Sequence, residues 1–373
     1  VIDASGARTS LGHDVSARQE VLTDRLGKVT VVDYDERGNV LRRTDPLGNS
    51  TTYTYDANDN MLSERDPLGN ARTYTYDASG NRLSETDPLG NTSTFTYTAR
   101  NSLLEHTDPR GGTTSATYDG RGNLLVETDP VGNRSHFSYD SRGNELSRTD
   151  AAGGTQTFQY DAAGNPIRST DPLGSVTERR FDASGNVLTE TRTRLINGAS
   201  QAVATHYAYD ARNRRVRMID PEGAVTTTSY TATAREESTV DAVGRVTQHF
   251  YDEQSRLTST AYPDGTTEAV AYDAEGRWIR SVDRAGRETS HTLDSAGRLV
   301  TATFADGTTR RVEYDPAGRV VSETDPSGRV TTMAYDAVGR QILLTDAAGV
   351  TSLAYDSDSN VISSTDRNGN TTT

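Results

Sequence analysis

One short phrase repeats along this chain, and its repetition restricts the possible folds more than any other feature. The phrase TYTYDASGNRLSETDPLGN occupies residues 73–91, and a near copy, TYTYDANDNMLSERDPLGN, occupies residues 52–70. Counted from the aromatic residue of the Tyr-Asp pair, the copies follow a constant 21-residue period over most of the chain. A short fixed period is typical of repeat architectures, in which each repeat is one supersecondary unit that packs on its neighbours.

We call the aromatic residue before this aspartate the anchor of its repeat. The step from Phe181 to Tyr209 is longer than the others, the step before Tyr355 is slightly shorter, and Leu293 holds the anchor position once. The predicted structural anchors are Tyr34, Tyr55, Tyr76, Tyr97, Tyr118, Tyr139, Tyr160, Phe181, Tyr209, Tyr230, Tyr251, Tyr272, Tyr314, Tyr335 and Tyr355.

Each repeat contains two turn sequences. Asp-x-x-Gly-Asn follows the anchor, as in residues 77–81, and Asp-Pro-x-Gly-Asn comes about ten residues later, as in residues 87–91. Proline favours the second position of a type I turn, and the aspartate caps the turn through its side chain. Glycine then supplies the left-handed residue that closes a three-residue hairpin loop. The turn glycines assigned this role are Gly48, Gly69, Gly90, Gly132, Gly174, Gly223 and Gly328.

The segments between the turns alternate as strands do, and no segment has a helical period. In residues 73–76, for example, Tyr74 and Tyr76 are two apart and so share one face, while the returning segment offers Leu83. One repeat therefore predicts one β-hairpin with three or four apolar side chains. That number covers one face of a sheet thinly and does not fill a globular interior.

Composition agrees with a thin structure. Only 32% of the residues are apolar, and the formal net charge is -14. About seventeen hairpins give roughly 34 strands, and a flat sheet of that size would run some 160 Å. Open sheets rarely exceed about ten strands without curling or splitting, and long free edges template aggregation. The sequence therefore predicts an all-β fold in which tandem 21-residue hairpins wind as a continuous spiral antiparallel sheet around a hollow space.

A β-propeller is the alternative architecture. Two repeats make 42 residues, which is close to the four-stranded propeller blade of about 40–45 residues. Inner and outer strands of a blade differ, so odd and even repeats would differ systematically. They do not, and the Gly-His and Trp-Asp marks of propeller blades are missing. The spiral is the favoured prediction.

The phrase YDASGNRLSETDPLGN resembles the YD repeats of Rhs polymorphic toxins, of the C components of insecticidal Tc toxin complexes and of teneurins. The resemblance spans residues 1–373. It implies a shell of β-hairpins, which in the toxins encloses a toxic C-terminal domain and in teneurins serves adhesion between cells. These residues contain no recognisable toxin domain and no self-cleaving plug region, so the resemblance extends to architecture and role but to no catalytic residue.

The resemblance implies a structural, noncatalytic shell segment of an exported polymorphic toxin, secreted or displayed at the cell surface. Its expected partner is an enclosed toxin or effector domain, with a secretion apparatus or a cell-surface protein as a further partner. The alternative is an adhesion module that binds glycans or proteins on the outer face of the sheet. No cofactor, metal site or catalytic residue is predicted. The acidic balance disfavours nucleic acid, and no apolar run reaches the roughly 18 residues of a membrane span.

The whole chain, residues 1–373, reads as a single repeat array, and the sequence suggests that it is cut mid-repeat at both ends, with no signal peptide in this fragment. The longer step after Phe181 predicts an elongated hairpin at about residues 186–208, with its turn at Asn197-Gly198. Such a hairpin is either a tolerated loop extension or a contact point for cargo or a partner.

Later turns often end in Gly-Arg where early turns end in Gly-Asn. These arginines are expected to pair with turn aspartates of the adjacent coil, or else to be solvated; they are Arg245, Arg287, Arg298, Arg319, Arg329 and Arg340. Calcium is a second possible use of the turn aspartates. They lie about ten residues apart, one in each turn, and capping alone accounts for that spacing.

Overall fold

The computed structural model describes residues 9–196 and 199–373, and within these ranges it contains strands and turns but no helix. The strands number 35 in the described part of the chain, and they belong to one antiparallel sheet. The prediction of tandem hairpins in an all-β fold is confirmed. None of the described residues forms a helix that is long and apolar enough to span a membrane.

The strands are short, mostly five or six residues. In the first half of the chain they are β1 (Ser10–Asp14), β2 (Gln19–Thr23), β3 (Val29–Tyr34), β4 (Val40–Thr44), β5 (Ser50–Tyr55), β6 (Met61–Arg65), β7 (Ala71–Tyr76), β8 (Arg82–Thr86), β9 (Thr92–Tyr97), β10 (Leu103–Thr107), β11 (Thr113–Tyr118), β12 (Leu124–Thr128), β13 (Arg134–Tyr139), β14 (Glu145–Thr149), β15 (Thr155–Tyr160), β16 (Pro166–Thr170), β17 (Val176–Phe181) and β18 (Val187–Ile196).

The remaining strands are β19 (Ala199–Tyr209), β20 (Arg215–Ile219), β21 (Val225–Tyr230), β22 (Glu236–Val240), β23 (Val246–Tyr251), β24 (Leu257–Ala261), β25 (Thr267–Tyr272), β26 (Trp278–Val282), β27 (Glu288–Leu293), β28 (Leu299–Thr303), β29 (Thr309–Tyr314), β30 (Val320–Thr324), β31 (Val330–Tyr335), β32 (Gln341–Asp346), β33 (Gly349–Tyr355), β34 (Val361–Thr365) and β35 (Thr371–Thr372).

Strands pair with their neighbours in sequence, so the sheet is a simple meander whose turns alternate between two rims. We call the turns that follow the anchors, such as residues 77–81, the YD turns, and the others, such as residues 87–91, the DP turns. All YD turns lie on one rim of the sheet and all DP turns on the other, because successive turns of a meander fall on opposite edges.

A β-bulge stands beside the anchor in almost every hairpin. In β7–β8 the partners are Thr75↔Ser84 and then Tyr76↔Arg82, so Leu83 is an extra residue on the returning strand. The strand pairs closed by DP turns, such as β8–β9, keep an even register. Bulges bend a strand and increase its twist. Because they recur on the YD side of the sheet, we infer that they help it curl.

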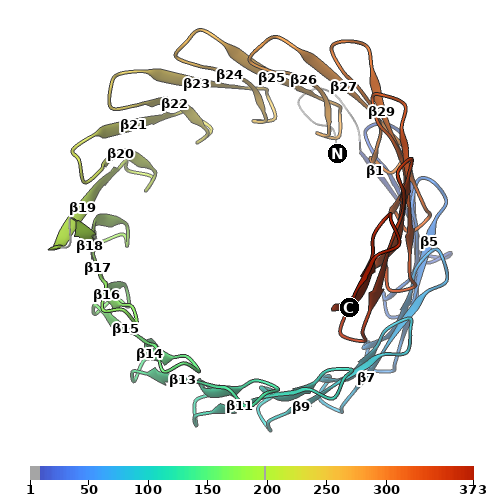
Figure 1. Ribbon diagram of the computed structural model, residues 1–373, viewed down its shortest axis with the longest axis horizontal. Helices are drawn as coiled ribbons and strands as arrows, with labels where there is room; N and C mark the ends of the chain where they lie inside the picture. Colours follow the sequence, from blue (N-terminus) through green and yellow to red (C-terminus); the bar gives the residue numbers. More distant parts are fainter. Residues whose placement is uncertain (1–8, 197–198) are drawn as a thin grey trace.

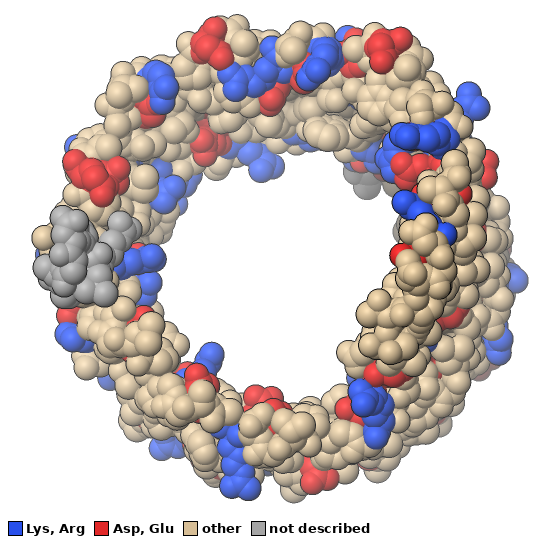
Figure 2. All heavy atoms as spheres, viewed as in Figure 1, with Lys and Arg blue, Asp and Glu red and all other residues tan. Residues whose placement is uncertain are grey.

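The curled sheet winds round into a ring that is open at its centre (Figures 1 and 2). The chain continues past one full circle, so β27–β34 lie over the first strands and the molecule is a spiral. Contacts between the two coils join residues 246 to 250 apart in sequence, such as Arg110 with Asp356 and Arg25 with Glu275. One coil therefore holds about twelve 21-residue repeats. This winding excludes the propeller, whose blades would radiate from an axis.

The wall of the ring is one sheet thick and has almost no interior. Within the described residues the buried apolar side chains are Val32, Ala302 and Val312. The accessible surface is 21919 Å², whereas a compact protein of this mass would expose roughly 14,500 Å². The sheet is therefore held together by its ladder of hydrogen bonds and by the contacts at its rims.

Both irregular steps of the repeat have a local cause. β18 and β19 are the two longest strands, and they pair over eight positions from Thr189↔His206 to Ile196↔Ala199. The expected turn at Asn197-Gly198 lies outside the described residues. The shorter step before Tyr355 comes from a tighter turn, since Asp346 pairs directly with Gly349.

Candidate functional site

The residues that recur in each repeat meet at the joints between hairpins, and these joints are the candidate sites of the chain. Anchor tyrosines reach back to the preceding hairpin. The Tyr335 hydroxyl donates a hydrogen bond to the Val320 carbonyl at 2.7 Å, and Val320 directly follows the preceding YD turn. The same kind of bond is made by Tyr97, Tyr118, Tyr160, Tyr209, Tyr230, Tyr251, Tyr272, Tyr314 and Tyr355.

The other anchors occupy the same strand ends with different contacts. The Tyr34 hydroxyl donates to Glu20 Oε2 at 2.9 Å. Tyr55, Tyr76 and Tyr139 are half-buried, and burial is the main cause that raises the pKa of each phenol. Phe181 ends β17 without a hydroxyl.

Each turn aspartate organises its own loop. In the YD turn of residues 77–81, Asp77 Oδ1 accepts the backbone N–H groups of Ser79 and Asn81, and Oδ2 accepts the side-chain amide of Asn81. These hydrogen bonds stabilise the carboxylate and lower the pKa of Asp77. The Asp-x-x-Gly-Asn pattern is thus a self-contained cap that uses both carboxylate oxygens.

The fourth residue of each loop needs a left-handed backbone, and glycine usually supplies it. The named turn glycines all lie between φ +82° and +90°: Gly48, Gly69, Gly90, Gly132, Gly174, Gly223 and Gly328. The chain tolerates other residues in this conformation, among them Asp59 and Asn101. Short polar side chains adopt it at lower cost than others do.

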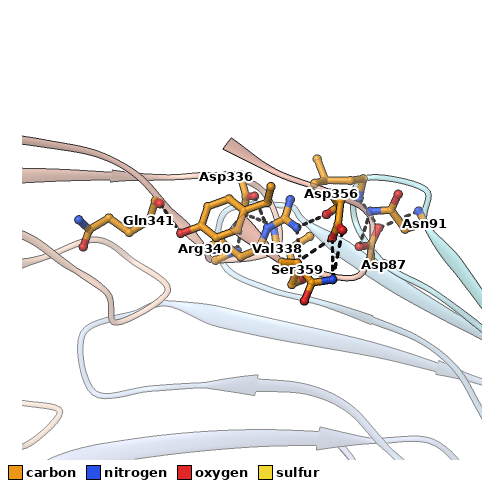
Figure 3. A network of polar contacts seen from close by, with 12 residues as sticks. Asp87, Asn91, Asp336, Val338, Arg340, Gln341, Asp356 and Ser359 are labelled. Carbon is orange, nitrogen blue, oxygen red and sulfur yellow. Dashed lines mark hydrogen bonds and ion pairs between the residues drawn. The ribbon is translucent and has the colours of Figure 1, made fainter. Parts of the chain in front are cut away.

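Arginine at the end of a YD turn makes a second joint to the next hairpin. Arg319 Nε donates a hydrogen bond to Asp315 Oδ2 of its own turn. Its Nη1 donates a hydrogen bond to the Asp336 carbonyl of the next YD turn. Its guanidinium carbon lies 4.9 Å from the ring centroid of Tyr335, the next anchor. Figure 3 shows the equivalent Arg340 between Asp336 and Asp356. The stacking distance is 4.5 to 4.9 Å in the pairs Arg214–Tyr230, Arg256–Tyr272, Arg298–Tyr314, Arg319–Tyr335 and Arg340–Tyr355.

The expectation that the Gly-Arg arginines pair between coils is wrong. Each of them forms an ion pair with the aspartate of its own turn, four residues earlier, at 2.6 or 2.7 Å: Arg245, Arg287, Arg298, Arg319, Arg329 and Arg340. Each arginine pairs within its own turn because the hydrogen bonds of the turn already hold the aspartate beside the last residue of the loop. On the YD rim these side chains are 15–24% exposed, and on the DP rim 68–74%.

The stacking of arginine on the next anchor is a feature that the sequence analysis missed. Its trace in the sequence is an arginine at the end of a YD turn together with a tyrosine at the next anchor position, as in Arg298 and Tyr314. The strand register that brings the two residues together is visible only once the hairpins are placed side by side.

The seam between the coils joins the DP rim of the first coil to the YD rim of the second. The backbone N–H of Arg25 donates to Glu275 Oε1 at 2.6 Å, and its Nη1 donates to the Ala274 carbonyl. Further round the ring, Arg110 Nη1 lies 3.1 Å from Asp356 Oδ2 and its Nε lies 3.7 Å from Asp358 Oδ2. Strands of the two coils do not contact each other in the described part of the chain, so the turns alone form the seam.

No group of three or more His, Asp or Glu residues in the described ranges could hold a metal ion. The turn carboxylates that suggested calcium are occupied by N–H donors of their own loops, as at Asp77. His249, which stands in the aromatic column two residues before an anchor, contacts Thr260 across the sheet at 3.2 Å. The contacts at the joints fix one hairpin on the next and one coil on the other.

This chain belongs to the RHS repeat family. The family description "RHS Repeat" matches residues 34–71, 55–92, 76–113, 118–156, 160–195, 235–267, 272–309 and 314–351. No curated protein matches the sequence.

Several solved structures share the fold. A TcdB2-TccC3-Cdc42 structure aligns with a TM-score of 0.76 and 16% identity over 96% of this chain and 22% of that chain, and a TcdB2-TccC3 structure aligns with 0.76 and 16% over 96% and 23%. A Photorhabdus luminescens Tc holotoxin pore gives a TM-score of 0.60 and 15% identity over 95% and 26%. The chain spans about a quarter of the length of these proteins. The likeness establishes the fold, that of an Rhs repeat shell.

The joint that Arg319 makes to the next hairpin, by stacking on Tyr335 and by its bond to the Asp336 carbonyl, can be tested with a pair of variants. Arg319 and Arg277 both pair with the aspartate of their own turn, but the anchor after Arg277 is Leu293, which has no ring to stack on. We expect Arg319→Ala to lower the free energy of unfolding by about 0.5–1 kcal/mol more than Arg277→Ala does. Urea denaturation followed by circular dichroism measures both. Equal losses in the free energy of unfolding of the two variants would contradict a stabilising role for the stacking.

The turn caps predict a loss of stability in acid. Hydrogen bonds from Arg214, first from its side chain and then from its backbone, lower the pKa of Asp210 from 3.8 to about 2. A carboxyl whose pKa is lower in the folded state stabilises the fold above the unfolded value, and this stabilisation is lost as pH falls through the folded value. We expect the melting temperature to fall between about pH 4 and pH 2, and Asp210→Asn to reduce that fall. A melting temperature that stays constant or rises as the pH falls over this range would contradict a stabilising role for the turn caps.

Proposed function

We propose that this chain is a wall segment of a hollow shell that encloses a C-terminal toxin or effector domain of an exported polymorphic toxin. Its own role is structural and noncatalytic, and the enclosed domain is its principal partner. The observation that carries the proposal is the seam. A sheet that winds past a full circle and bonds to itself through its turns makes a continuous wall around a space (Figure 1).

The construction of the wall supports this role. A protein that works through its own interior would bury a core, whereas this chain buries three apolar side chains among its described residues and surrounds an open centre (Figure 2). Within the described residues the sheet has no free hydrogen-bonding edge along the wall, because each strand from β2 to β34 pairs on both sides. Such a wall separates a guest from solvent without a fitted contact surface.

The neighbours in fold support the assignment to a toxin. They are named as TcdB2-TccC3 complexes, one of them with Cdc42, and as a Tc holotoxin pore. By analogy, the proposed location is outside the producing cell, after secretion or at the cell surface, and the further partner is the machinery that delivers the shell.

Protection of the guest from protease tests the proposal in the complete product of the gene that encodes these residues. Arg110→Glu places a third carboxylate beside Asp356 and Asp358, which should open the seam by repulsion. We expect a segment outside residues 1–373 to resist protease in the natural protein and to become sensitive in Arg110→Glu. Arg110→Lys keeps the charge at the seam and is the matched control.

Two results would contradict enclosure. One is a natural protein in which every segment outside the array is cleaved as fast as in Arg110→Glu. The other is a ring without guest density in an electron microscopy map of the complete product. Binding of the natural protein to cells or glycans in either case would favour the adhesion module instead.

A further inference from the structure

Within the described residues the seam contains five joints, and each joint sets one DP turn of the first coil against one YD turn of the second. The first joint is marked by the contact of Arg25 with Glu275, and the fifth by the contact of Arg110 with Asp358. The DP turns are residues 24–28, 45–49, 66–70, 87–91 and 108–112, and the YD turns are residues 273–277, 294–298, 315–319, 336–340 and 356–360. Both series advance by one repeat at each step, so the three middle joints follow in order.

Two further observations support this order. A cavity of about 320 Å³ at the seam is lined by Asp45 and Pro67 from the first coil and by Ala296, Ala317 and other residues from the second. Figure 3 includes residues from both turns of the fourth joint in one network of polar contacts, residues 87 and 91 from the first coil and residues 336 and 340 from the second.

The third residues of the turns, counted from the aspartate, match in character across the joints. On the DP side they are Leu26, Leu47, Leu68, Leu89 and Arg110, and on the YD side Glu275, Ala296, Ala317, Val338 and Asp358. The three middle joints therefore set leucine against alanine or valine, whereas the two end joints carry opposite charges, at Arg25 beside Leu26 in the first joint and at Arg110 in the fifth.

The leucines of the seam are partly covered. Leu47, Leu68 and Leu89 are 42–48% exposed, whereas Leu173, at the same place in a DP turn outside these joints, is 93% exposed. The opposite YD turn therefore removes about half of the exposed surface of each leucine from water, which is favourable for an aliphatic side chain.

A seam shifted by one repeat in either direction would break this match. If each DP turn met the following YD turn, Leu89 would lie opposite Asp358. If each DP turn met the preceding YD turn, Arg110 would lie opposite Val338. A charge that is partly desolvated without its partner raises the free energy of the shifted arrangement.

The register of the seam determines the size of the ring, because a shift by one repeat adds one hairpin to a coil or removes one. The curvature of the sheet alone does not fix this number, since the twist between strands varies by more than such a small change requires. We propose that the third residues of the seam turns specify the number of hairpins in one coil. The charged end joints select the register, and the apolar joints between them stabilise it.

A disulfide can report the register, because the sequence contains no cysteine and a disulfide needs two Cα atoms within about 7 Å. Leu47→Cys with Ala296→Cys reports the observed register, and Leu47→Cys with Ala317→Cys reports the register advanced by one repeat. Neighbouring YD turns lie two strands apart, roughly 10 Å. We expect the first pair to oxidise in preference in the otherwise natural chain, as measured on a nonreducing gel. Spin labels on the same cysteines measure both separations if neither disulfide forms.

Moving the charge along the rim should move the register. The double variant Leu89→Arg with Arg110→Leu sets its arginine opposite Asp358 only when the seam advances by one repeat. We expect the ratio of the two disulfide yields to change by about threefold to tenfold toward the second pair. Leu173→Arg adds the same side chain to a DP turn outside the five joints, and this control should leave the ratio unchanged.

The proposal is overturned if the double variant keeps the natural ratio, because the curvature of the hairpins would then set the coil. It is also overturned if the otherwise natural chain favours the second pair. Circular dichroism shows whether each variant is folded. If the double variant does not fold, Arg110→Leu alone serves as the test, and an unchanged yield of the first pair would overturn the proposal. None of these results bears on enclosure of a guest, because the chain is tested without one.

Discussion

The structure depends on hydrogen bonds between successive hairpins, because the described residues bury too few apolar side chains to hold the repeats together. The backbone ladder supplies the continuous part of this bonding, and the anchor hydroxyl adds a bond from each YD turn to the one before it, as from Tyr335 to Val320. Arginines such as Arg319 strengthen the same joint from the other side, by stacking on the next anchor ring. The repeat is short and polar because its main task is to present these groups at a fixed spacing.

A wall built in this way has consequences at both of its rims. The bulge beside each anchor recurs on the YD side, and the sheet curls until it meets itself. The closing contact is made between loops such as those of Arg110 and Asp356, and the strands of the two coils stay apart. Loops tolerate changes of sequence that strands do not. A shell of this kind can therefore vary its seam without disturbing the sheet.

Much of this structure could be predicted from the sequence, since the 21-residue period, the turn glycines and the low apolar content each have a direct local meaning. Gly90 needs a left-handed backbone whatever its surroundings. The partners of the long side chains could not be predicted, because they depend on strand register and on the number of repeats in a coil. Arg298 illustrates this limit: the sequence suggested a partner in another coil, whereas its aspartate lies four residues away and its ring partner, Tyr314, on the next hairpin.

The central claim is that the chain forms a curved wall around empty space, and cryo-electron microscopy of the isolated chain tests it most directly. Class averages viewed along the spiral axis should show a ring with an open centre and a thicker arc where the two coils overlap (Figure 1). A filled disc, a compact globule or blades radiating from an axis would contradict the account.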